Sequence, residues 1–308
     1  MILKLRSAVS ERLWPIVRAL ALQALSWSGW VGYLPALAIF AITSYAFGWP
    51  VLGPDDEHLL ITPDVRAWLM VIAQLSRLAI FVLAWRLIEH KTLREMSLEH
   101  FRSLWRPLLL GVLVGASGIS LVVLAMIASG CLQLTWAIPS ISGHASLGGV
   151  GFLLAISFLG PLTEEIESRG YLFQNVFRGW GTKVATIVTA IVFAARHLQN
   201  PEASALGIIN IALISIGLTL GMLQLRSLWY AIGWHIAWNF SLSFIFGLAN
   251  SGHSLKSFGI AGASVFSSNL SGQTWLSGGG FGPEGSVLTT IVITLQIAFL
   301  ARLMRRPS

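Results

Sequence analysis

Three short motifs place charged, imidazole or amide side chains inside strongly apolar stretches of the sequence. An ionisable side chain within a bilayer costs roughly 2.5 to 3.5 kcal/mol on insertion scales, so each one needs a partner or a function. Side chains four residues apart lie on the same face of a helix, and each motif therefore directs its polar groups to one side. The motifs are Glu164-Glu165-x-x-x-Arg169, Phe193-x-x-x-His197 and His235-x-x-x-Asn239.

These residue types could hydrolyse a peptide bond with an activated water molecule. A carboxylate near a histidine can take a proton from water. A second histidine and an asparagine amide can donate hydrogen bonds to the oxyanion that forms. The alternative is structural, because the same groups could hold helices together through interhelical hydrogen bonds.

Counting along the helices that must carry these motifs places them at a common depth. At about 1.5 Å per residue, Glu164 and His197 each lie about 21 Å from the basic ends of their helices. His235 and Asn239 lie about 12 and 18 Å from the start of theirs. The three motifs can therefore meet in one layer of a helical bundle.

The pair Gly160-Pro161 precedes the acidic motif and predicts a kink or a break in its helix. With a break, Thr163 would cap a new helix whose first turn holds Glu164 and Glu165, where the helix dipole favours carboxylates.

Three further charged residues lie near the motifs. Arg77 is expected to neutralise one of the acidic residues. Glu167 is expected to face the headgroups or to pair with Arg169, and so to lie outside the site. Arg196 is expected to be solvated at the outer membrane interface.

The composition indicates a membrane protein. Of 308 residues, 55% are hydrophobic and 11% are charged, and the mean hydropathy is +0.74, which favours the bilayer as solvent. The net charge of +7 is carried by short basic clusters between apolar runs, so lipid headgroups are the expected partners and nucleic acid is not. The single cysteine, Cys131, excludes a disulfide within the chain.

Apolar run lengths predict an all-α, polytopic membrane bundle of about eight transmembrane helices. The segment that begins at Leu147 continues beyond Gly160 as a more polar helix to about Arg178. The segments are Val31 to Phe47, Ala67 to Ile88, Pro107 to Ser129, Leu147 to Gly160, Lys183 to His197, Ala203 to Leu225, Ser227 to Leu248, and Val287 to Leu303.

Basic residues gather on one side of these segments, which predicts that both termini lie inside (N-in, C-in). Residues 1–30 carry several basic residues on an apolar stretch and are expected to form an amphipathic interfacial segment. Residues 31–308 are expected to form one membrane domain, whose core at 148–248 carries the three motifs. The Gly/Ser-rich stretch Asn250 to Gly285 is expected to be a flexible exposed loop. No internal repeat supports a transporter built on inverted halves.

The ordered motifs resemble the CPBP family of intramembrane proteases, which includes type II CAAX prenyl endopeptidases and related bacteriocin-processing or immunity proteins. The family pattern is Glu-Glu-x-x-x-Arg, then Phe-x-x-x-His, then His-x-x-x-Asn, each on a separate membrane helix. The resemblance covers roughly Gly148 to Leu248. The sequence departs from the family where Ser168 stands in place of a common aromatic residue.

The resemblance implies an intramembrane endopeptidase in which Glu164 is the general base. Glu165 and Arg169 would form a supporting pair, with Phe193 and Arg77 in further supporting positions. It implies that His197 orients the water and that His235 and Asn239 stabilise the oxyanion.

A metal is left open by the sequence. Zinc would use Glu164, His197 and His235, but the chain has no His-Glu-x-x-His motif, and the roles above need no metal.

The resemblance further implies a multi-pass integral protein of a bacterial inner or plasma membrane. Its substrate would be a peptide or protein, with a prenylated C-terminus, a pheromone-like peptide or a bacteriocin leader as candidates. Two other functions stay open: a non-catalytic scaffold or bacteriocin immunity protein, and a transporter with Arg77, Glu164 and His197 as a proton relay.

Overall fold

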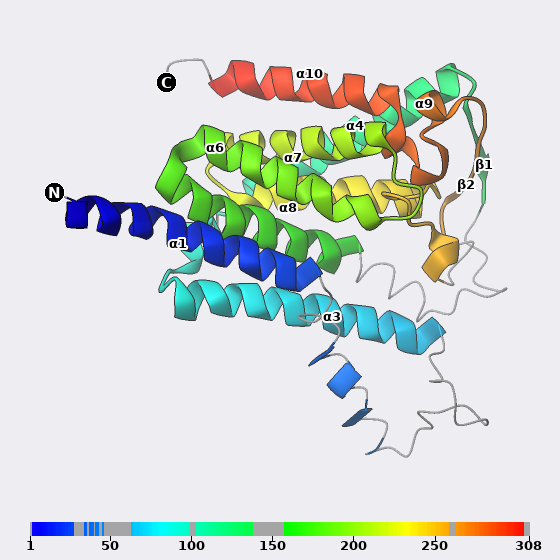
Figure 1. Ribbon diagram of the computed structural model, residues 1–308. Coiled ribbons are helices and arrows are strands. Elements are labelled where there is room, and N and C mark those ends of the chain that lie inside the picture. The colour runs from blue at the N-terminus through cyan, green and yellow to red at the C-terminus, as the bar shows by residue number, and fades with distance from the viewer. Residues whose placement is uncertain are drawn as a thin grey trace.

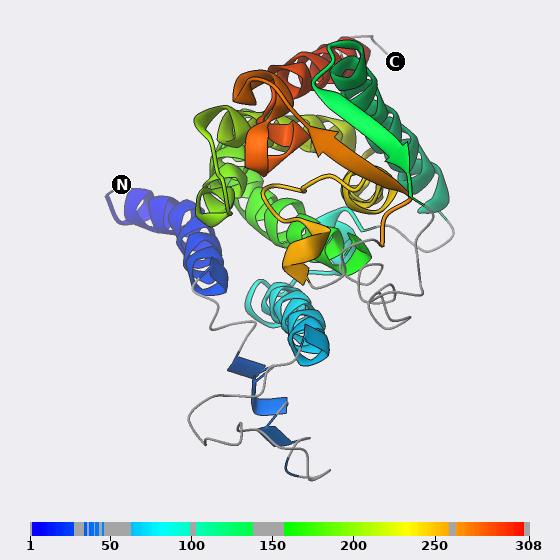
Figure 2. The ribbon, with the colours of Figure 1, turned by 90° about the vertical axis from the view of Figure 1, so that its right-hand side faces the viewer.

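The computed structural model is a bundle of long helices with a small two-stranded sheet at one end (Figures 1 and 2). It describes residues 2–27, 63–98, 103–137, 157–258 and 263–304, together with a few residues between 34 and 45. The predicted segment Val31 to Phe47 and the first ten residues of the segment from Leu147 lie largely outside this part. The start of α1 and the end of α10 lie at the same end of the bundle (Figure 1).

The long helices match the apolar runs of the sequence closely. A π-helical turn, Ala84–Ile88, extends α3, and a second one, Ser241–Ile245, extends α8. The helices are α1 (Ile2–Trp27), α3 (Pro63–Leu83), α4 (Trp105–Ala128), α6 (Phe173–Arg196), α7 (Ala205–Leu225), α8 (Leu228–Phe240) and α10 (Val287–Met304).

The chain reverses direction at Gly181, inside α6. Its φ of 76° and ψ of 176° lie outside helical geometry and are readily adopted only by glycine. Glu167 and Arg196 form an ion pair across this turn. In one straight helix they would lie about 43 Å apart. The 43-residue apolar segment Ser157–Gln199 is therefore two antiparallel arms, and the predicted helix from Lys183 to His197 is the second arm.

Helices α4 and α8 pack closely because glycines line their interface. A Cβ atom at Gly111 would lie 2.1 Å from the Tyr230 carbonyl oxygen, and one at Gly115 would lie 2.3 Å from that of Trp234. On α8, a Cβ at Gly233 would lie 2.3 Å from the Leu108 carbonyl oxygen. Small residues let membrane helices approach in this way. This contact fixes α8, the helix that carries His235.

The predicted break at Gly160-Pro161 is wrong. Residues 157–165 are helical throughout and run directly into a π-helical segment, η3 (Ile166–Leu172). The Thr163 hydroxyl donates to the Leu159 carbonyl at 2.8 Å, which is a bond inside a helix and not a cap. The carboxylates therefore lie within a continuous helix. A π-helical turn changes the direction of successive side chains, and such turns are frequent at functional sites.

The stretch Asn250 to Gly285 also differs from its prediction as a flexible exposed loop. In its described parts, strand β2 (Phe266–Leu270) pairs antiparallel with β1 (Leu132–Trp136), and short helices follow, including α9 (Thr274–Ser277) and η8 (Pro283–Gly285). Phe281 and Glu284 are buried. Buried side chains anchor the stretch to the bundle.

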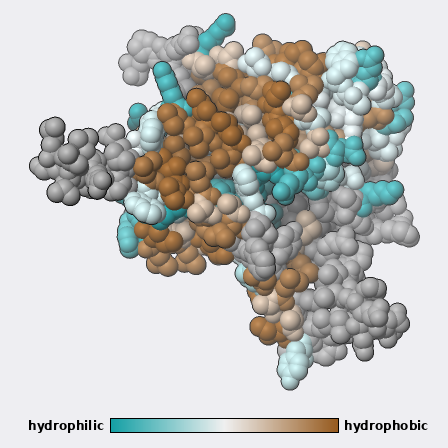
Figure 3. Space-filling model, viewed as in Figure 1, coloured by the Kyte–Doolittle hydropathy of each residue, from teal (hydrophilic) through white to brown (hydrophobic). Residues whose placement is uncertain are grey.

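The surface of the bundle is suited to lipid. Within the described part of the chain, four segments are long and apolar enough to cross a membrane: Leu69–Ile88, Trp105–Ala128, Ser157–Gln199 and Ala205–Leu225. The shorter Val287–Leu303 is also apolar. Leu113 on α4 and Leu295 on α10 are about two-thirds exposed. Apolar side chains cover much of the face in Figure 3. Large exposed apolar areas on helices indicate contact with acyl chains, as in an integral membrane protein.

Candidate active site

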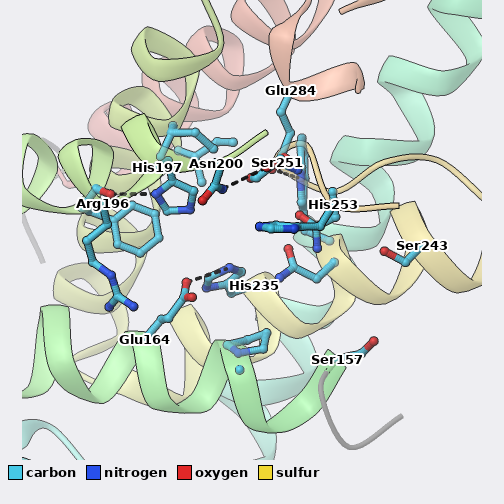
Figure 4. A pocket seen from close by; sticks show the side chains of 18 of the residues that line it. Ser157, Glu164, Arg196, His197, Asn200, His235, Ser243, Ser251, His253 and Glu284 are labelled. Atoms are coloured by element: carbon cyan, nitrogen blue, oxygen red, sulfur yellow. Dashed lines mark hydrogen bonds and ion pairs between the residues drawn. The ribbon is translucent and has the colours of Figure 1, made fainter. Parts of the chain in front are cut away.

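Each of the three motifs contributes at least one polar residue to one cavity of about 240 Å³ (Figure 4). Glu164 reaches it from the helix that precedes η3, and His197 from the end of the second arm of α6. His235 and Asn239 reach it from α8. The predicted common depth of these four residues is therefore observed. Trp234 and Trp238, whose rings stack at 4.7 Å, supply apolar wall.

His235 lies between the two adjacent carboxylates. Its Nδ1 is 2.8 Å from Oε1 of Glu165, and its Nε2 is 3.9 Å from Oε2 of Glu164. Because Glu165 accepts a hydrogen bond, Nδ1 carries a proton and Nε2 faces Glu164 and the cavity. Glu164 has a 23% exposed side chain, whereas Glu165 is fully buried. The two neighbouring glutamates thus have different environments.

Glu165 and Arg169 form a buried pair behind His235. Nη1 of Arg169 donates to Oε1 of Glu165 at 2.9 Å, as the four-residue spacing predicts. Nη2 donates to the backbone and hydroxyl oxygens of Ser215 on α7. Neither member of the pair lines the cavity. Glu165 orients His235, and Arg169 ties η3 to α7.

Phe193 joins the motifs through its ring. The Arg169 guanidinium carbon lies 4.4 Å from the ring centroid, a cation–π contact. The ring centroids of His197 and His235 lie 5.1 and 6.0 Å away. Phe193 therefore fixes the relative positions of both histidines. These contacts account for the presence of an aromatic residue in the motif.

His197 is held by its own helix. Its Nδ1 lies 2.8 Å from the Phe193 carbonyl oxygen, to which it donates. This bond leaves Nε2 available to the cavity. Asn239 brings its amide to the cavity wall one helical turn after His235.

A second polar wall of the cavity, which includes Asn200, Ser251, His253 and Glu284, was not predicted from the sequence. Glu284 accepts hydrogen bonds from the Ser251 backbone and hydroxyl and from Nε1 of Trp238. Burial raises the pKa of Glu284 in spite of these bonds. Burial likewise lowers the pKa of His253. Asn200 donates to the Ser251 carbonyl at 2.9 Å. The signal for this wall was an isolated histidine and glutamate in an otherwise nearly uncharged stretch.

The predictions for Glu167 and Arg196 are wrong. Glu167 is fully buried and accepts hydrogen bonds from Arg77, at 2.7 and 2.9 Å, and from Arg196. It does not pair with Arg169, because Arg169 is directed to Glu165. Arg196 lines the cavity with a side chain that is only 14% exposed. The prediction that Arg77 neutralises an acidic residue agrees with its pairing to Glu167.

A metal-binding arrangement was tested against the side chains. In the part of the chain that the structure describes, no three histidine, cysteine, aspartate or glutamate side chains are grouped as metal ligands would be. Glu164, His197 and His235 share the cavity but not such a grouping.

Residues 146–241 match the family model described as type II CAAX prenyl endopeptidase Rce1-like. The match covers less than half of the chain, and it contains all three motifs. It confirms the predicted resemblance to the CPBP intramembrane proteases. No curated protein and no solved structure matched the chain.

Proposed function

We propose that this chain, with its Rce1-like segment at residues 146–241, is an intramembrane endopeptidase that hydrolyses a peptide bond with a water activated by Glu164. The supporting observation is the convergence of Glu164, His197, His235 and Asn239 on one cavity in an apolar bundle. Glu164 is the most exposed of the three carboxylates on its helix, so it is the one that can reach water.

In the proposed reaction, Glu164 takes a proton from the water while the water oxygen bonds to the substrate carbonyl carbon. His197 orients the water through Nε2. The amide of Asn239 donates to the oxyanion, and His235 donates through Nε2 in its imidazolium form, in which both ring nitrogens carry a proton. The carbon–nitrogen bond then breaks as Glu164 returns its proton to the leaving amine. The immediate products are a carboxylic acid and an amine. Transfer of the acid proton to the amine then gives a carboxylate and an ammonium ion, so all atoms and charges balance.

The family match supports a peptide or protein substrate. A peptide with a prenylated C-terminus is our first candidate, and a bacteriocin leader or a pheromone-like peptide is the second. We propose a multi-pass location in a bacterial inner or plasma membrane with both termini inside, which the basic clusters of the sequence favour.

The test uses the purified full-length chain with a library of prenylated and unprenylated peptides, with and without a chelator. Defined cleavage products, read by mass spectrometry, are the expected result, and they would also identify the substrate class. Full activity in the chelator supports the metal-free chemistry. A folded chain that cleaves no peptide would contradict the proposal and favour a scaffold or immunity protein.

A further inference from the structure

Three carboxylates from one helix and three guanidiniums lie at or behind the Glu164 side of the candidate site. They are Glu164, Glu165, Glu167, Arg77, Arg169 and Arg196. An ionised carboxylate and a guanidinium carry opposite unit charges. The three arginines are shared unevenly among the three glutamates.

Glu165 and Arg169 form a closed pair with no net charge, and both side chains are fully buried. Glu167 instead has two arginine partners, Arg77 at 2.7 Å and Arg196. This second group, which we call the arginine–glutamate triad (Arg77, Glu167 and Arg196), has one positive charge in excess.

Glu164 has no guanidinium partner of its own within salt-bridge distance among the described residues. Arg196 lines the same cavity, and in Figure 4 its side chain and that of Glu164 extend toward the same space. Arg196 also attracts the Glu164 carboxylate through space, as do Arg77, His197 and His235. The excess charge of the triad therefore lies beside the one carboxylate that lacks its own arginine.

We propose that Arg196 is a positioning residue whose charge, left over from its pairing with Glu167, holds Glu164 ionised and oriented as the base. A carboxylate in an apolar site loses hydration and needs a compensating charge to remain ionised. The triad supplies that charge from one side of Glu164, and His235 lies on the other.

Hydrogen bonds from α1 also hold the triad in place. Glu167 accepts from Ser26 of α1 at 3.2 Å, and its carbonyl accepts from Gln23 at 3.0 Å. Arg77 comes from α3 and Arg196 from α6. The other titratable group facing Glu164 is His253, from the segment before η6 (Leu255–Phe258). Glu284 lines the same cavity from η8. Neither of these two supplies an arginine's permanent charge.

This inference rests on the proposed function, and a charge-balance experiment tests it with the cleavage assay. Arg196→Gln leaves Glu167 paired with Arg77, so the triad loses its excess charge without leaving a buried carboxylate unpaired. We expect kcat to fall about tenfold or more with little change in KM. Arg196→Lys should retain most of the activity, because the charge is kept.

The double variant Arg196→Gln with Glu167→Gln restores one net positive charge, that of Arg77. We expect it to recover most of the lost kcat, which a purely structural role of the ion pair would not produce. Arg18→Gln is the matched control, since Arg18 makes a bidentate pair with Glu89 away from the cavity. It should keep the wild-type kcat.

Three outcomes would overturn the inference while the wild-type chain still cleaves: an unchanged kcat in Arg196→Gln, no recovery in the double variant, or a KM effect confined to peptides with a free C-terminal carboxylate. The last would make Arg196 a substrate-binding residue. Failure of the proposed function is distinct, because then the wild-type chain itself would be inactive.

Discussion

Nδ1 of His235 lies 2.8 Å from Oε1 of Glu165, the same oxygen that accepts from Nη1 of Arg169. One buried carboxylate oxygen thus binds an imidazole and a guanidinium. The neighbouring Glu164 is left to face the cavity. In the proposed reaction, the two consecutive glutamates therefore have separate tasks: Glu165 orients a histidine, and Glu164 reaches the water and the substrate.

Glu165→Gln should reduce kcat by about tenfold or more, because its amide can no longer fix the proton on Nδ1 of His235 as a carboxylate does. The substitution also leaves Arg169 without its charged partner, which costs about 3 to 5 kcal/mol for a buried pair. Cleavage rate and thermal unfolding are measured together. The double variant Glu165→Gln with Arg169→Met removes the unpaired charge. It should recover thermal stability but not kcat. Recovery of both would show that the pair serves folding alone.

Glu284 makes stability depend on pH. Its pKa is raised in the folded chain because burial disfavours the charged carboxylate. Between the ordinary glutamate pKa and this raised pKa, the folded state binds more protons than the unfolded state, so stability falls as pH rises through that window. Glu284→Gln removes this dependence.

The measurement for Glu284 is the unfolding temperature of wild type and Glu284→Gln at pH 4 and pH 7. We expect the advantage of wild type over the variant to be larger at pH 4. An advantage that is equal at both values, or larger at pH 7, would show that the buried carboxylate is not held neutral.

Gly115→Ala should destabilise the bundle by about 1 to 3 kcal/mol, because overpacking forces backbone movement. The added Cβ would lie 2.3 Å from the Trp234 carbonyl oxygen, next to His235. Activity should fall with stability as α8 moves. Gly217→Ala is the matched control, since its nearest contact would be an ordinary 3.6 Å. Equal unfolding temperatures for the two variants would contradict the close packing of α4 and α8.

The sequence was sufficient to predict the Glu164, His197 and His235 cluster. The four-residue spacing gives the helix face of each residue, and its distance in sequence from the helix end gives its depth, so both can be worked out from the sequence. The ion pair between Glu167 and Arg196 could not be predicted in this way. Their meeting depends on the reversal at Gly181 and on which neighbours cover each face of a helix, and neither is a local property.

The wall that contains Glu284 was missed for a different reason. Its Gly- and Ser-rich composition is typical of a linker, but burial there comes from partners distant in sequence. Trp238 donates to the Glu284 carboxylate, and Asn210 donates to its carbonyl at 2.8 Å. The supposed cap at Thr163 failed because the helix continues through Pro161, and the Thr163 hydroxyl donates to the Leu159 carbonyl within that helix.

The central claim is that Glu164 activates the water, and the cleavage rate of Glu164→Gln tests it most directly. Glutamine is nearly isosteric but cannot take a proton. With the variant shown to be folded in the membrane by its unfolding temperature, we predict that kcat falls by about 10²- to 10⁴-fold. Cleavage of the same peptide bond at the wild-type rate would contradict the account.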